Sequence, residues 1–182
     1  MVVHPPYRWQ VGYRRWLDEQ LPQLSAHTGV TVAVENMFPV RFRGERGVTL
    51  HASQQIEELE RFPNAVLDTS HAAVSGLDLE KTARRLGDRL AHVHLSNNAG
   101  KGWDSHLPVD RGVLDLAAFL RDLTSWGFAG TISLELDLRQ QQANEETLLR
   151  LLVENRLFCE KHLAPQDSTR SHRRNRPGLP SV

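Results

Sequence analysis

Short apolar runs alternate with longer amphipathic stretches along the chain. The runs share a length of four to six residues and a high content of β-branched side chains. They are Met1–His4, Val30–Glu35, Ala65–Asp68, Leu90–His94 and Thr131–Glu135. Runs that are apolar at nearly every position are typical of strands in a parallel sheet that is covered on both faces. We therefore predict five buried parallel strands.

Helix-like patterns fill the segments between these runs. Their ranges are Trp9–Ala26, Ser53–Arg61, Asp78–Leu86, Leu116–Trp126 and Glu145–His162. In the first range large apolar residues recur at spacings of three and four, which is the period of an α-helix. Ser53 and Asp78 are residue types that cap the start of a helix, and Gly127 is typical of the position just after its end.

The two patterns repeat in the order strand, helix, with strand starts roughly 25 to 40 residues apart. This spacing is typical of parallel strands joined by right-handed crossovers, and it fits either a doubly wound sheet or a (β/α) barrel. No strand is followed by a GxGxxG turn or a GxxxxGK[ST] loop, so a nucleotide-binding Rossmann or P-loop fold has no support. The length of 182 residues fits one domain.

Composition changes this picture mainly at the C-terminal end. Hydrophobic residues make up 40% and charged residues 24% of the chain, and the net charge is zero. This balance excludes collagen-like, coiled-coil and wholly disordered chains. Residues 165–182 are rich in Ser, Pro and Arg, so we predict a disordered basic tail after a domain at residues 1–164. The remaining body is slightly acidic, and nucleic acid is therefore not an expected partner.

Membrane and export signals are not apparent in the sequence. No apolar run approaches the roughly 18 residues that a membrane span needs, and the first residues lack the pattern of a signal peptide. The single cysteine, Cys159, cannot form an internal disulfide and lies on the apolar side of the last helix pattern. We expect a cytoplasmic protein with Cys159 in its core.

Each predicted strand ends on a residue that can ligate a divalent metal. These residues are His4, Glu35, Asp68, His94 and Glu135. The carboxyl ends of barrel strands converge on one mouth, where catalysis takes place. An unpaired carboxylate at the buried positions Glu35 and Glu135 would cost on the order of several kcal/mol. The pattern therefore predicts a site rather than a purely structural role.

Further candidates lie just outside the strands. His71 follows Asp68 by three residues, and Asp104, His106 and Arg111 lie in a loop that contains several glycines. An Asp-x-His sequence can place two ligands on one side of a metal, and polar residues in loops are often functional. Simpler interpretations stay open, because Asp-x-x-His can be a local turn cap and a loop arginine can simply be solvated.

The other histidines are predicted to have no functional role. We place His27, His51, His162 and His172 on the surface. We expect His92 to point to the opposite face of its strand from His94 and to be structural.

Six short sequences together resemble the xylose isomerase-like TIM-barrel superfamily. They are VVHPP, VAVENMFP, VLDTSHA, HVHLSNN, WDSHLPVDRG and ISLELD, in this order over residues 2–138. The superfamily contains sugar isomerases and epimerases as well as endonuclease IV-type apurinic-site nucleases. The resemblance implies that one divalent metal is bound by Glu35, Asp68, His94 and Glu135. It also implies that His4, His71, Asp104 and His106 match positions that hold further zinc ions in the nuclease branch.

The chain departs from the family pattern in two ways. The nuclease branch has an Asn-Asp pair after the strand-end histidine, whereas this chain reads Leu95-Ser96-Asn97-Asn98. The family barrel has eight strands, and VVHPP resembles the fourth. We therefore expect an incomplete (β/α) TIM barrel of about five of eight β-α units. Its two outer strands would be open edges, which favour association with a second copy.

The function expected from these residues is that of a divalent-metal-dependent isomerase or epimerase of a small keto-sugar, polyol or sugar phosphate. A proton would move at the carbon next to a carbonyl, with Glu35 and Glu135 as base and acid. A divalent ion (Mn, Zn, Mg or Co) would polarise the carbonyl. His71 and Arg111 would hold substrate hydroxyls or a phosphate. The alternatives are a zinc-dependent apurinic-site endonuclease and a barrel fragment without activity.

Overall fold

Five parallel strands form one sheet in sequence order, as the sequence predicts. The computed structural model describes residues 1–40, 47–52, 55–140 and 144–164. The strands are β1 (Val2–Val3), β2 (Ala33–Glu35), β3 (Ala65–Asp68), β4 (Leu90–Leu95) and β5 (Thr131–Leu134). All neighbouring pairs are parallel. This arrangement is an incomplete (β/α) barrel.

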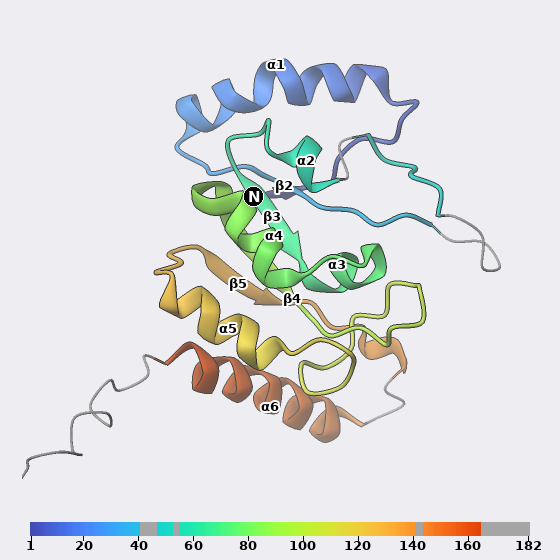
Figure 1. Cartoon of the computed structure of the whole chain (residues 1–182), viewed down its shortest axis with the longest axis vertical. Coiled ribbons are helices and arrows are strands. Elements are labelled where there is room, and N and C mark those ends of the chain that lie inside the picture. Colours follow the sequence, from blue (N-terminus) through green and yellow to red (C-terminus); the bar gives the residue numbers. More distant parts are fainter. Residues whose placement is uncertain (41–46, 53–54, 141–143, 165–182) are drawn as a thin grey trace, which may run out of the picture.

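Helices follow the strands and lie along the sheet, with α1 at the top of Figure 1, α3 and α4 near the middle, and α5 and α6 at the bottom. They are α1 (Val11–Thr28), α2 (Ile56–Leu59), α3 (Thr69–Ser75), α4 (Leu79–Leu86), α5 (Leu116–Ser125) and α6 (Glu145–Leu163). Two short 3-10 turns, Gly87–Arg89 and Leu138–Gln140, complete the elements. Every helix except α3 falls within a predicted range or within one or two residues of it.

Side-chain caps fix where several helices begin. Asp78, Asp115 and Asn144 each accept a hydrogen bond from a backbone N–H three residues on, at 2.9–3.0 Å. Ser53, the predicted cap of the second helix, lies outside the described residues. Gly127 follows α5 with a φ of +74°, as expected for a residue that ends a helix.

Alternate strand residues face opposite sides of the sheet. Val34, Leu67, Val93 and Leu95 are completely buried in one apolar core with side chains of the helices, and Cys159 belongs to this core as predicted. Their sequence neighbours project from the other side, which we call the inner face. This inner face carries polar side chains, so the expectation of strands that are apolar on both faces applies only to the helix-facing side. The predicted burial is wrong for β5 and for Glu135 just after it, because β5 is an edge strand and its residues are exposed or half-buried.

His92 lies on the inner face together with His94. The two ring centroids are 5.0 Å apart with the rings perpendicular. The prediction that His92 points away from His94 is wrong, because the side-chain period of a strand is two residues and positions two apart share a face.

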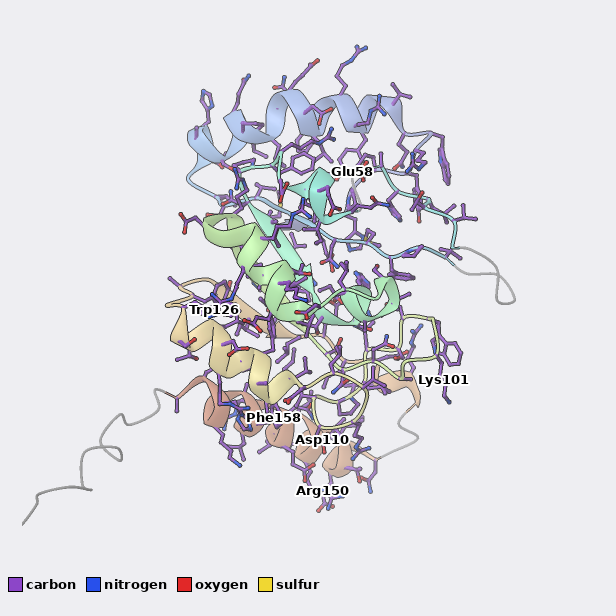
Figure 2. The ribbon with its side chains drawn as sticks, viewed as in Figure 1. Glu58, Lys101, Asp110, Trp126, Arg150 and Phe158 are labelled. Carbon is purple, nitrogen blue, oxygen red and sulfur yellow. The ribbon has the colours of Figure 1, made fainter. Side chains whose placement is uncertain are left out.

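The two edges of the sheet are β1 and β5. Between them, at the amino-terminal ends of the strands, lies a hollow of about 910 Å³ lined in part by Val2, Ala33, His92 and Thr131. Trp126, labelled in Figure 2 where α5 ends, forms part of its wall, and the Arg84 guanidinium stacks on this ring at 4.0 Å. Association through the edges stays a prediction.

Within the described ranges, no helix combines the length and the apolar content needed to cross a membrane. The cytoplasmic location stays a prediction. The predicted disordered tail at residues 165–182 lies outside the described residues.

The loop after β4 is held at its base by the buried side chain of Asn97. Its Nδ2 donates to the carbonyls of Val109 and Leu114, and its Oδ1 accepts from the N–H groups of Asn98 and Leu114. Gly112, with a φ of +147°, passes so close that a Cβ there would lie 2.2 Å from this Oδ1. The amide therefore fixes the ends of the loop that carries Asp104 and His106.

Asn97→Ala is expected to lower the free energy of unfolding by about 3 kcal/mol or more, because it leaves several buried backbone groups without partners. Urea denaturation followed by circular dichroism measures the change. Ser125→Ala is the control, since this exposed hydroxyl makes one hydrogen bond, to Asp122; its expected cost is about 0.5 kcal/mol or less. Equal costs for the two variants would contradict the supporting role of Asn97.

Candidate metal centre

Four side chains from neighbouring strands meet at the carboxyl ends of the sheet, on the inner face. Glu35 ends β2, Asp68 ends β3, His94 lies in β4 and Glu135 directly follows β5. Their potential ligand atoms all lie within 4.8 Å of one another. His94 Nδ1 is 2.7 Å from Glu135 Oε2 and 3.0 Å from Glu35 Oε1. We call these four residues the primary group.

Strand register brings the primary group together. Asp68 pairs with His94 across β3 and β4, and the N–H of Glu135 donates to the carbonyl of Leu95. Parallel strands in register place their carboxyl ends at one edge of the sheet. The four side chains therefore converge although Glu135 lies 100 positions after Glu35 in the sequence.

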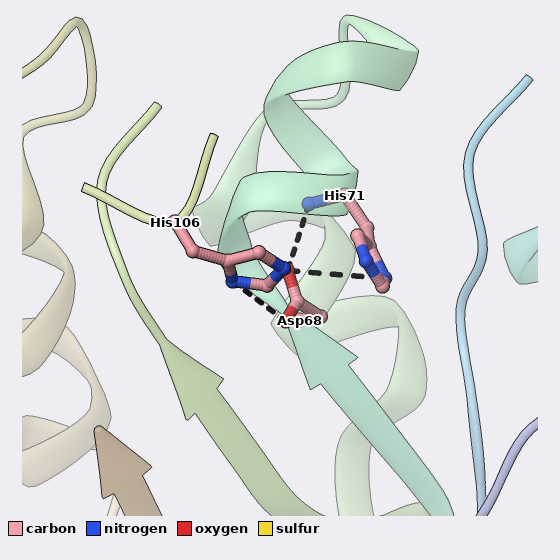
Figure 3. A group of neighbouring side chains, drawn as sticks. All are labelled: Asp68, His71 and His106. Carbon is pink, nitrogen blue, oxygen red and sulfur yellow. Dashed lines mark hydrogen bonds and ion pairs between the residues drawn. The ribbon is translucent and has the colours of Figure 1, made fainter. Parts of the chain in front are cut away.

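Asp68 also belongs to a second group, with His71 and His106 (Figure 3). Its Oδ1 accepts a hydrogen bond from the N–H of His71 at 2.7 Å and so caps α3. The His71 ring Nδ1 lies 3.9 Å from the same oxygen, and His106 Nδ1 lies 4.0 Å from Oδ2. The Asp-x-x-His sequence is therefore a helix cap and at the same time part of a cluster of potential ligands.

Asp104 contacts both histidines of the second group. Its Oδ2 lies 2.6 Å from His106 Nε2 and 3.4 Å from His71 Nε2, while its Oδ1 accepts from the Ser70 hydroxyl at 2.6 Å. Burial alone would raise the pKa of Asp104, but the hydrogen bonds from His106 and His71 hold this pKa well below its usual range. The carboxylate is thus ionised at neutral pH.

His4 extends the cluster toward the β1 edge. Its Nε2 lies 3.0 Å from Glu35 Oε2, and 64% of its side chain is exposed whereas only 1% of the Glu35 side chain is. The close contact with the Glu35 carboxylate raises the pKa of His4. His4 therefore links a buried carboxylate to solvent.

Carboxylates hold two histidines in their charged form, the partly buried His94 and the buried His71. Burial by itself lowers the pKa of His94, but Glu135 and Glu35 outweigh it and raise this pKa to about 10. Burial likewise lowers the pKa of His71, and contacts with carboxylates, Asp104 first among them, raise it to about 9. In the metal-free protein both rings are therefore protonated on both nitrogens and positively charged at neutral pH.

The two most buried carboxylates shift in opposite directions. Burial would raise the pKa of Glu35, but its close contacts with His4 and His94 lower it to about 2. For Asp68 burial dominates over the attraction of His71, and its pKa is raised to about 6. Asp68 is thus the less stabilised of the two anions.

A buried oxygen of Asp68 marks the centre of the cluster. Its Oδ2 is shielded from solvent and accepts no hydrogen bond from any described residue. Glu35 Oε2 is likewise buried without hydrogen-bond geometry, although His4 lies near it. Buried polar atoms normally have partners. A set of carboxylate oxygens and one imidazole nitrogen fits a divalent cation, which would satisfy both oxygens.

Asn36 is a positioning residue that the sequence analysis missed. Its Oδ1 accepts from the Asp68 N–H at 2.7 Å and its Nδ2 donates to the Asp68 carbonyl at 3.2 Å. Its own carbonyl accepts from His71 Nδ1 at 2.8 Å. A polar residue directly after a buried strand end is the only signal in the sequence. Ser70 and Ser96, which contact Asp104 and His106, were also missed.

Arg111 lies apart from both groups. Its recorded ion pair is with the neighbouring Asp110, at 3.8 Å, and its side chain is 55% exposed. The preceding Val109 N–H donates to Asn155 of α6, and Figure 2 shows Asp110 near this helix. In the described part of the chain no contact joins Arg111 to the cluster, and its role in substrate binding stays a prediction.

The remaining histidines are only partly where the sequence places them. His27 is exposed, as predicted. His51 and His162 are partly exposed, and each packs one side of its ring against an aromatic side chain, Tyr7 and Phe158 respectively. His172 lies outside the described residues.

Residues 1–154 match the model of the family described as xylose isomerase-like TIM barrel. An uncharacterized protein of Mycobacterium tuberculosis is 34% identical over 186 residues, which cover 90% of this chain and 64% of the relative. An uncharacterized protein of Methanocaldococcus jannaschii is 27% identical over 176 residues, covering 88% of this chain and 59% of the relative. The chain thus spans less than two thirds of the length of these curated relatives.

Solved structures share the fold. A D-tagatose 3-epimerase-like protein superposes with a TM-score of 0.56 at 22% identity, over 90% of this chain and 64% of the other. An L-ribulose 3-epimerase superposes with a TM-score of 0.55 at 21% identity, over 88% of this chain and 57% of the other. At these identities the likeness establishes the shared fold.

The metal-free protein is expected to lose stability as the pH rises above 6.5. The pKa values of His71 and His94, about 9 and about 10, lie above the ordinary value of 6.5. Their stabilising ion pairs are therefore complete below pH 6.5 and are lost as the pH rises through 9 to 10. Melting in EDTA should show Tm falling by about 5 °C or more between pH 6.5 and 9.5. His94→Gln should flatten this slope, and a Tm that rises over the same interval would show the sign to be wrong.

Proposed function

Because this chain belongs to the xylose isomerase-like TIM-barrel family, we propose that it carries the metal centre of a divalent-metal-dependent isomerase or epimerase. The substrate would be a small keto-sugar, a polyol or a sugar phosphate. The observation that supports this most is the buried Asp68 Oδ2, which has no described hydrogen-bond partner and lies among Glu35, His94 and Glu135. The relatives are longer than this chain, and the activity assigned to the whole protein is therefore part of this proposal.

The primary group would hold one divalent ion through Glu35, Asp68, His94 and Glu135. When bound, such an ion supplies a Lewis acid that polarises the substrate carbonyl and its neighbouring hydroxyl. Mn, Zn, Mg and Co all remain candidates, since the donor set combines carboxylates with a single imidazole.

Glu135 and Glu35 would exchange protons with the substrate carbon. A base must be ionised to accept a proton, and the pKa of each carboxyl is held low, that of Glu135 chiefly by His94. Glu135 is the accessible one, with 46% of its side chain exposed. Glu35 is buried but touches His4, which reaches solvent and would renew its proton. Transfer from one side and return from the other inverts the carbon.

His71 would orient a substrate hydroxyl, and Arg111 would do so only if its loop brought it toward the mouth. His71 is fixed for such a role by its hydrogen bond to the Asn36 carbonyl and its contact with Asp104. The expected partner is thus a small polyhydroxylated molecule rather than nucleic acid.

A zinc-dependent apurinic-site endonuclease is the second candidate. The observation in its favour is the second group, where His71, His106 and Asp104 converge beside Asp68 and offer ligands for more ions. Against it, this chain reads Leu95-Ser96-Asn97-Asn98 after the strand-end histidine, where the nuclease branch has an Asn-Asp pair. The side-chain amides of Asn97 and Asn98 donate to the backbone carbonyls of Val109 and Trp103 in the loop that follows. A barrel fragment without activity is the third alternative.

The number of bound ions separates these alternatives. After loading with Mn²⁺, Co²⁺ or Zn²⁺ and gel filtration, plasma mass spectrometry is expected to find about one ion per chain for the isomerase and about three for the nuclease. Asp68→Asn should abolish binding, whereas Asp110→Asn, a matched change on the exposed loop, should leave it intact. A chain that retains no ion would exclude both enzymes in favour of the inactive fragment.

Glu135→Gln is expected to slow proton exchange at the substrate carbon by about 100-fold or more, since it removes the accessible base. Exchange is measured in D₂O by mass spectrometry of ketoses such as D-tagatose and L-ribulose. Glu146→Gln, on the exposed start of α6, is the control and should match the wild type. Persistence of wild-type exchange in a folded, metal-loaded Glu135→Gln protein would refute the assignment of Glu135.

A further inference from the structure

We propose that His92 is a positioning residue for His94 and that Thr131 holds His92 in place. The side chains of His92 and Thr131 would form a support on the inner face that keeps Nδ1 of His94 directed at the candidate metal site. The relevance to a metal rests on the proposed function, whereas the support itself rests on the geometry of β4 and β5.

The sheet places the three residues in contact. His92 pairs with Thr131 across β4 and β5, and His92 Nδ1 lies 2.8 Å from Thr131 Oγ1. One step along β4 the ring of His94 meets that of His92 edge to face, with centroids 5.0 Å apart and an interplanar angle of 90°. This is a favourable geometry for two rings.

His94 needs such a support to act as a ligand. Its Nδ1 points between two carboxylates, 2.7 Å from Glu135 and 3.0 Å from Glu35. The torsion that turns an imidazole about its Cβ–Cγ bond has broad minima and does not fix this direction by itself. The perpendicular ring of His92 restricts the turn, because rotation of His94 would drive its edge into that ring.

His92 itself is not placed as a ligand. Its Nδ1 is committed to Thr131, and it belongs to neither group of potential ligands found among the described residues. It lines the hollow at the amino-terminal side, one layer below the cluster. Its position is that of a residue that acts through its neighbour, as supporting partners of metal-binding histidines do.

Four variants test the support. His92→Ala removes the ring, His92→Phe keeps a ring but loses the hydrogen bond, and Thr131→Val removes the hydroxyl at constant shape. Ser133→Ala is the matched control, since Ser133 lies on the same strand and face, pairs with His94 and has no recorded side-chain hydrogen bond in the described structure. Circular dichroism melts establish that each variant is folded.

The readouts are Co²⁺ affinity by calorimetry, the visible spectrum of the Co²⁺ protein, and the imidazole ¹⁵N signals of His94 in the metal-free protein. His92→Ala is expected to weaken Co²⁺ binding by about tenfold or more and to shift the visible bands, with His92→Phe restoring affinity to within about threefold of wild type. Thr131→Val should fall between them and Ser133→Ala should change nothing. In the metal-free His92→Ala protein the His94 signals should broaden or shift.

Two negative results have different meanings. Unchanged His94 signals and unchanged Co²⁺ affinity in His92→Ala would overturn the support. A wild-type protein that binds no Co²⁺, while the His94 signals still change in His92→Ala, would overturn the proposed metal function and leave the support of His94 standing.

Discussion

The cluster depends on one buried carboxylate that serves two neighbours at once. One oxygen of Asp68 caps α3, and the other faces the rings of His94 and His106 without a hydrogen bond. Asn36 clamps the backbone of the same residue from the adjacent strand. Because its backbone and its carboxylate are both held by hydrogen bonds, the Asp68 side chain stays buried. In the metal-free protein the nearby positively charged histidines offset part of the desolvation of this carboxylate.

Histidine rings and carboxylates alternate at the carboxyl ends of the strands, so that opposite charges lie next to each other. Glu35 lies between two rings, and Asp104 lies between two others. The protonated rings of His71 and His94 carry positive charge beside these acids in the metal-free protein. Under the proposed function, a divalent ion bound by the primary group would take the place of the extra proton on His94 and would neutralise the same carboxylates.

The sequence predicts the sheet and the convergence of the cluster because both depend on local features, the apolar runs and the residue at the end of each run. Apolar runs mark the strands, and a chargeable residue at the end of a strand such as Glu35 must reach the common mouth. The short helix α3 is not predicted, since seven residues directly after a strand show no helical period. Asn36 is missed because its partner Asp68 is 32 residues away. His92 is misassigned through an error of strand period, and the placement of Arg111 depends on how its loop packs against α6.

Alternation along the strands separates the core from the cluster residue by residue. Leu67 and Val93 face the helices, while Val66 and His92 face inward beside the candidate centre. Residues of the inner face can therefore be substituted at alternate positions without changing the residues that face the helices. A substitution at an inner position of β4 or β5, such as His92 or Thr131, therefore changes the inner face without altering the side chains that pack against the helices.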